Sequence, residues 1–75
     1  MSIAEARARL QFAHRDLLGV WFRVRDRWRD ENAREFGVRV IEPLDTTLRN
    51  AANGMEHMEA QLVKLRKDCE IETKF

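Results

Sequence analysis

The sequence predicts an all-α fold, an antiparallel helical hairpin that forms one domain over residues 1–75. Apolar residues recur at helical spacing on both sides of a polar stretch, Arg29–Asn32. The 75 residues include only 3 Gly and 1 Pro, and 36% of them are charged, which is typical of long amphipathic helices. Opposite charges also recur four residues apart, as in Glu35 and Arg39, a pattern of solvent-facing helix surfaces.

The first helix is expected over about residues 3–28. Ser2 and Glu5 have the spacing of a capping box, in which the serine hydroxyl accepts a hydrogen bond from the amide three residues later. The apolar residues that follow predict a coiled-coil seam at heptad spacing: Ile3, Ala6, Leu10, Ala13, Leu17, Val20 and Val24. His14, Trp21 and Trp28 flank this seam and widen it into the broad face that a bundle helix needs.

The corner of the hairpin is expected at residues 29–31. The seam position after Val24 is the polar Glu31, so the first helix should end near Arg27–Arg29. Asp30 is a favourable N-cap for a second helix. Large aromatic side chains lie on both sides of it, and we expect them to fix the hairpin angle. The predicted corner residues are Trp21, Trp28, Asp30 and Phe36.

The second helix is expected over about residues 31–71, with a kink near Pro43, which removes a backbone hydrogen bond. One apolar stripe at helical spacing predicts this helix: Ala33, Phe36, Val40, Leu44, Leu48, Ala51, Met55, Met58, Leu62, Leu65 and Cys69. An alternative division stays open at this point. It places the corner at Gly37–Glu42 and Pro43 at the first position of the second helix.

Unequal helix lengths predict self-association. At 1.5 Å per residue the two helices measure roughly 38 and 60 Å, so the shorter helix cannot cover the longer one. The uncovered apolar residues form the predicted oligomer interface: Met55, Met58, Leu62, Leu65 and Cys69. The expected assembly is a homodimer in which two hairpins make a four-helix bundle. A different helical protein is the other partner class that fits.

The chemistry-bearing residues do not converge on a motif. His14, His57 and Cys69 are the plausible bases and nucleophiles, and their positions match neither a catalytic constellation nor zinc-ligand spacing. We therefore expect no enzyme activity and no catalytic, cofactor or metal site. The single cysteine also excludes an intrachain disulfide. The function expected is that of a non-enzymatic helical interaction protein.

An alternating run of arginines gives the alternative function, nucleic-acid binding. The run comprises Arg23, Arg25, Arg27 and Arg29, with Trp21, Phe22 and Trp28 nearby. On a helix Arg23 and Arg27 face one way while Arg25 and Arg29 face another, and the net charge of +1 does not favour a polyanion. The sequence has no apolar run long enough for a membrane span and no signal-peptide core. Cytoplasmic residence is expected, and export would use a route without a cleaved signal.

The corner sequence, Trp28-x-Asp30-x-x-Ala33-x-x-Phe36, resembles that of the small Trp-x-Gly (WXG-motif) proteins, the early-secretory-antigen-like substrates and partners of type VII secretion. In that family Trp-x-Gly lies in the turn of a helical hairpin, often followed by Ala and an aromatic residue at like spacing. Trp28 matches the tryptophan, and Asp30 stands where the family has glycine. The resemblance implies a hairpin that dimerises into four helices and a role as a secretion substrate or partner.

Overall fold

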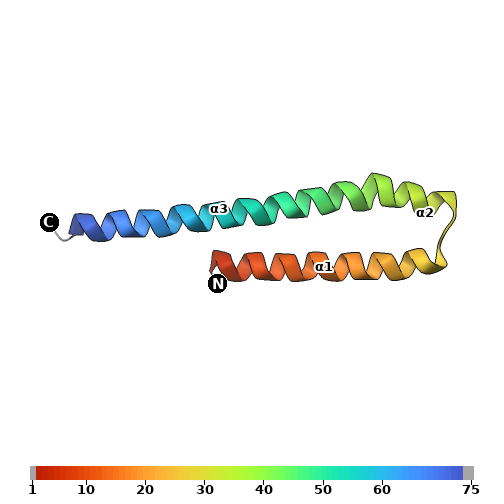
Figure 1. Ribbon diagram of the computed structural model, residues 1–75, viewed down its shortest axis with the longest axis horizontal. Coiled ribbons are helices and arrows are strands. Elements are labelled where there is room, and N and C mark those ends of the chain that lie inside the picture. The colour runs from red at the N-terminus through yellow and green to blue at the C-terminus, as the bar shows by residue number, and fades with distance from the viewer. Residues whose placement is uncertain (1, 74–75) are drawn as a thin grey trace.

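The computed structural model describes the backbone of residues 2–73 and side-chain surroundings as far as Cys69, and it is a hairpin of two antiparallel helical arms (Figure 1). The first arm is α1 (Ile3–Arg27). The second arm runs through α2 (Glu31–Phe36), a π-helical turn η1 (Gly37–Ile41) and α3 (Glu42–Thr73). No strand occurs among the described residues. The all-α prediction is therefore confirmed.

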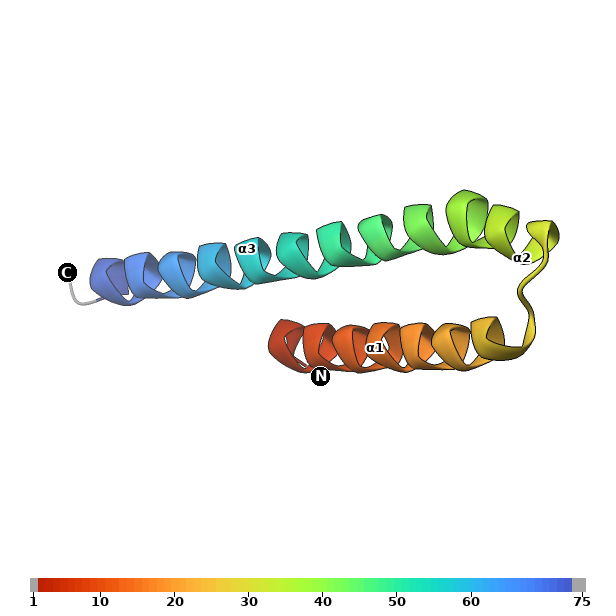
Figure 2. The same cartoon turned by 45° about the vertical axis from the view of Figure 1, so that its right-hand side comes forward.

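Two local capping interactions set where the arms begin. The Ser2 hydroxyl accepts a hydrogen bond of 3.1 Å from the amide of Glu5, and the Asp30 carboxylate accepts one of 3.0 Å from the amide of Ala33. Both predicted N-caps are confirmed. Between the arms, Trp28 and Asp30 have extended backbone angles. The chain reverses there, and the residues of the alternative corner, Gly37–Glu42, lie inside the second arm (Figure 2).

A π-helical turn lies just before Pro43, in the region where the sequence predicts a kink. The amide of Glu42 donates to the carbonyl of Gly37, five residues back. This wider turn precedes the one residue of the arm that has no amide hydrogen to donate. It also keeps Ala33, Gly37 and Ile41 on the side facing α1. In a regular helix each step of four residues advances about 40° around the axis, which would carry Ile41 away from that side.

The seam predicted for α1 is rotated in the structure. Trp21 is the buried residue of this helix, and the His14 side chain is mostly buried, whereas Val20 and Val24 are exposed. The contact row is therefore the predicted flank. The physical reason is size, because a buried tryptophan removes more apolar surface from water than a valine does. Rotating α1 to bury Trp21 turns the valines outward.

The single stripe predicted for the second arm divides into two rows. Ala33, Ile41 and Ala52 are buried against α1, with Leu48 and Met55 partly buried beside them. The remaining members turn to a neighbouring side of the arm and are exposed: Phe36, Val40, Leu44, Ala51, Met58, Leu62, Leu65 and Cys69. A continuous stripe requires a regular α-helix throughout, and the π-helical turn breaks that regularity.

The hairpin is a single layer. Its dimensions are 67 × 18 × 11 Å, and its radius of gyration is 18.8 Å, against about 11 Å for a compact domain of this length. Among the described residues the buried hydrophobic side chains are Trp21, Ala33, Ile41 and Ala52, and none of these is completely enclosed. A stable domain needs a second layer to close its core, so the shape itself directs attention to the two broad faces.

Candidate interaction surfaces

Three aromatic rings hold the corner end of the hairpin. The ring centroids of Trp21 and Phe36 are 5.4 Å apart, and those of Trp28 and Phe36 are 6.1 Å apart. Trp21 and Trp28 meet edge to face at 6.4 Å and 88°. Trp28 thus contacts Phe36, the pairing expected at the corner. Trp21 is the buried member at 8% exposure, whereas Trp28 is 37% exposed.

Gly37 lets the Trp21 ring approach the second arm. A Cβ atom placed on Gly37 would lie 3.1 Å from Cζ2 of Trp21, closer than carbon atoms in van der Waals contact. The absence of a side chain at this position therefore makes room for the indole. From the sequence, Gly37 is only a weak helix former. Its role in packing is seen only in the structure, where it contacts the Trp21 ring.

Polar pairs hold the other half of the hairpin. Nε2 of His14 donates to Oδ1 of Asp45 at 2.5 Å, and Nε of Arg49 donates to the same oxygen at 3.2 Å. The hydrogen bond from Arg49, followed by that from His14, lowers the pKa of Asp45 below its ordinary value. Near the N-terminal end of α1, Arg7 lies 3.6 Å from Glu59 and 3.8 Å from Glu56.

Sequence reasoning missed these interhelical pairs, although a signal was present. Arg7, His14, Trp21 and Trp28 recur every seven residues and so form one row of α1. Two members of that row are cationic or titratable, and they require acidic partners if the row faces another helix. The second arm supplies those partners in Asp45, Glu56 and Glu59.

The two broad faces of the hairpin differ in chemistry. One face carries exposed apolar side chains from both arms, and we call it the apolar face: Val20, Val24, Val40, Leu44, Met58, Leu62 and Leu65. Helical spacing places Val20 and Val24 on one side of the Trp21 row, and it places Leu44 and Met58 on the same side of the Ile41–Ala52 row. The face thus spans both arms.

The apolar face continues onto a part of α3 that extends beyond the N-terminal end of α1 (Figures 1 and 2). We call residues 60–73 the overhang. Every described side chain from Ala60 to Cys69 is exposed. Of the predicted interface residues, Met58, Leu62, Leu65 and Cys69 are exposed, whereas Met55 is partly buried within the hairpin.

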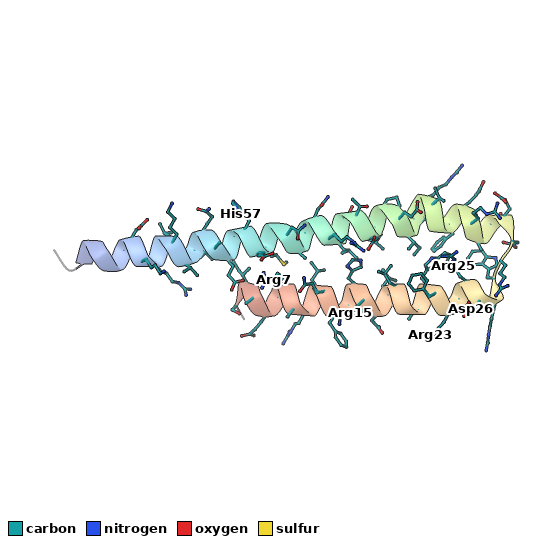
Figure 3. The ribbon with its side chains drawn as sticks, viewed as in Figure 1. Arg7, Arg15, Arg23, Arg25, Asp26 and His57 are labelled. Atoms are coloured by element: carbon teal, nitrogen blue, oxygen red, sulfur yellow. The ribbon has the colours of Figure 1, made fainter. Side chains whose placement is uncertain are left out.

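The opposite face contains a groove between the arms at the corner end. The groove has a volume of about 800 Å³, and its lining includes Arg25 and Arg29 from α1 and its continuation. Arg23 and Arg27 instead border a shallow hollow beside Val20 and Val24. Figure 3 shows Arg25 on the side of α1 that borders the second arm and Arg23 on the side turned away from it. The four arginines are therefore divided between two surfaces.

Few other candidate functional groups occur within the part of the chain that the structure describes. His57 is exposed on α3 and Cys69 is exposed on the overhang. No group of three or more His, Cys, Asp or Glu side chains is placed to hold a metal ion among these residues. None of the described helices has both the length and the apolar character that crossing a membrane requires.

Comparisons with known protein families, curated proteins and solved structures find no match for this chain. The surfaces described above therefore carry the functional argument.

Proposed function

We propose that this chain is a non-enzymatic helical interaction protein that works as a homodimer, with two hairpins stacked through their apolar faces into a four-helix bundle. The observation that carries the proposal is the single-layer shape with exposed apolar residues along one broad face. Stacking a second hairpin on that face supplies the missing layer. A two-fold axis lets each copy offer the same surface to the other.

The surface area of one chain supports an interface of dimer size. A compact monomer of 8.9 kDa exposes roughly 4,800 Å², whereas this chain exposes 6493 Å². The excess is about 1,700 Å² per chain, or about 3,400 Å² for two chains, which lies in the range of total area that obligate dimers bury. Covering the groove face alone would leave the apolar face in water, so the apolar face is the favoured interface.

The overhang supports a second copy as the occupant. Its apolar side chains, Leu62 and Leu65, continue the apolar face past the end of α1. A partner must therefore supply a helix of matching length beyond that end. An antiparallel copy of the same chain has such a helix, because its second arm is as long as the one that it would cover.

The resemblance at the corner supports a more specific proposal, that the dimer acts as a substrate or partner in a type VII-like secretion system. Trp28 occupies the corner, and Asp30, which replaces the family's glycine, caps the second arm. The test is the genetic setting: a type VII ATPase gene beside this one, and loss of the protein from culture medium when that gene is deleted. Retention in the cell in both strains would contradict export.

Light scattering at micromolar concentration tests the dimer. We expect a mass of twice 8.9 kDa for the unmodified chain. Leu65→Glu should raise the dissociation constant at least about tenfold, since burying an unpaired carboxylate costs more than the 1.4 kcal/mol that a factor of ten represents. Leu65 is 58% exposed in the single hairpin, so the change leaves the hairpin itself undisturbed.

Val63→Glu is the matched control. Val63 is 47% exposed and lies two residues away in the same overhang. Val63 follows Ala52 by eleven residues, about three helical turns, so it continues the row that faces α1 and lies outside the apolar face. Its substitution should therefore raise the dissociation constant much less than Leu65→Glu does. A monomer mass for the unmodified chain, or dissociation by Val63→Glu and not by Leu65→Glu, would contradict the proposed interface.

A further inference from the structure

We propose that the groove at the corner end binds a small organic anion with a flat aromatic body, held by Arg25 and Arg29 over a floor of aromatic side chains. The site lies on the broad face opposite the proposed dimer interface and does not depend on dimerisation. Its volume of about 800 Å³ lies within the range of small-molecule sites, which are typically apolar clefts with a few polar groups.

The charges of the groove favour an anion near α1. Within the described residues neither Arg25 nor Arg29 forms an ion pair, whereas Arg34 pairs with Glu31 at 3.3 Å and Arg49 pairs with Asp45 at 3.2 Å. Arg25 lies in the last turn of α1, Arg29 lies in the corner just after it, and both line the groove. Two guanidinium groups that line one groove can donate jointly to one carboxylate, sulfonate or phosphate group.

Within the described residues no acidic side chain of the groove forms an ion pair with Arg25 or Arg29. Asp45 is paired with His14 and Arg49, and the Asp30 carboxylate, which keeps its charge, is directed to the amide of Ala33 at the start of the second arm. Asp26 follows Arg25 and points about 100° further around the helix. Glu42 belongs to the opposite wall, on the second arm. The wall formed by Arg25 and Arg29 is therefore the positive one, and the anionic end of a ligand belongs there.

The floor explains why the ligand should have an aromatic body. Trp21, Phe22 and Trp28 line the groove beside the two arginines, and Phe22 is 57% exposed. Aromatic rings pack favourably against other rings, and guanidinium groups also stack on aromatic faces. An inorganic anion would use only the arginines and leave this apolar surface in water.

The fluorescent anion 8-anilinonaphthalene-1-sulfonate is a suitable probe, since it carries both a sulfonate and fused rings. We expect saturable binding, followed by the fluorescence of the probe and the quenching of Trp21 and Trp28. The double variant Arg25→Gln/Arg29→Gln should weaken binding about tenfold. The matched control Arg23→Gln/Arg27→Gln removes the same charge from neighbouring positions that border a different surface, and it should change binding less than about twofold.

A second matched pair tests the floor. Phe22→Ala should weaken binding of the same probe by about tenfold, whereas Phe12→Ala should not change it. Phe12 is 73% exposed on the same helix and does not line the groove. Circular dichroism should give equal helicity for all four variants, because all the altered residues are exposed.

Each remaining outcome contradicts the site. Equal weakening by the two arginine pairs would indicate general charge attraction, and no weakening by either would place the probe elsewhere. A binding experiment with a single-stranded DNA oligonucleotide completes the test. Oligonucleotide binding that both arginine pairs weaken equally, with no preference for the groove pair in probe binding, would replace the small-anion site with nucleic-acid tracking along α1.

Discussion

The two ends of the hairpin are the corner end and the open end, where α1 begins. At both ends the same heptad row of α1 contacts the second arm, but the contacts differ in kind. At the corner, Trp21 and Trp28 pack against Phe36 and make a small apolar cluster. Toward the open end, His14 and Arg7 meet carboxylates of the second arm. Burial of rings is worth several kcal/mol, whereas partly exposed ion pairs are worth little. The corner should therefore carry most of the stability of a single hairpin.

The difference also suits the proposed dimer. A hairpin that is firmly closed at one end and weakly paired at the other can keep its corner while the open end adjusts to a partner. The overhang belongs to that adjustable end (Figure 1). The polar pairs fix the register of the two arms, since each cation must meet its acidic partner. In the proposed dimer a partner chain would supply the burial that the open end lacks.

The largest expected effect is at the buried ring. Trp21→Ala should lower the free energy of unfolding by about 4 kcal/mol, since it leaves a cavity over Gly37. Trp28→Ala should cost only about 2 kcal/mol, because Trp28 is 37% exposed. Urea unfolding at one fixed protein concentration measures both. Equal decreases in the free energy of unfolding for the two variants would show that Trp21 and Trp28 contribute equally to the stability of the corner.

The second prediction concerns acid sensitivity at the middle of the row. The hydrogen bonds from Arg49 and His14 hold the pKa of Asp45 below its ordinary value. A carboxylate with a lowered folded-state pKa stabilises the fold above the unfolded-state pKa of about 3.9, and this contribution is lost as the pH falls through the folded-state value. Asp45→Asn should therefore be less stable at neutral pH and should lose less stability on acidification.

Thermal melts from neutral pH to below pH 3 measure this second prediction. Asp16→Asn is the control, since Asp16 is an exposed acid of the first arm. Its acid profile should follow that of the unmodified chain. Parallel profiles for the unmodified chain and Asp45→Asn would show that the His14–Asp45–Arg49 cluster contributes nothing to acid sensitivity.

The smallest effect is expected at the open end. Arg7 lies 3.8 Å from Glu56 and 3.6 Å from Glu59, and both glutamate side chains are exposed to solvent. Arg7→Gln should therefore cost less than about 1 kcal/mol. The same urea series measures it, and added salt should shrink the difference from the unmodified chain. A loss as large as that of Trp28→Ala would mean that the open end is not the weak end.

The sequence by itself determined the features that depend on neighbours a few residues apart. It gave all-α structure, the two N-caps at Ser2 and Asp30, and the placement of Arg23 and Arg25 on different sides of α1. A hydrogen bond from a side chain to an amide three residues later has one local solution, and helical spacing fixes which arginines share a side. These predictions need no knowledge of how the two arms pack against each other.

The tertiary structure decided which side of each helix is buried. Both Trp21 and the neighbouring Val20 lie on apolar rows of α1, and periodicity cannot rank two adjacent rows. The ranking comes from the contact of Trp21 with Gly37 across the hairpin. The same holds for His14 and Asp45, which are 31 residues apart. Burial depends on what another arm presents, and that surface is set only when the arms pack and the π-helical turn fixes their rotation.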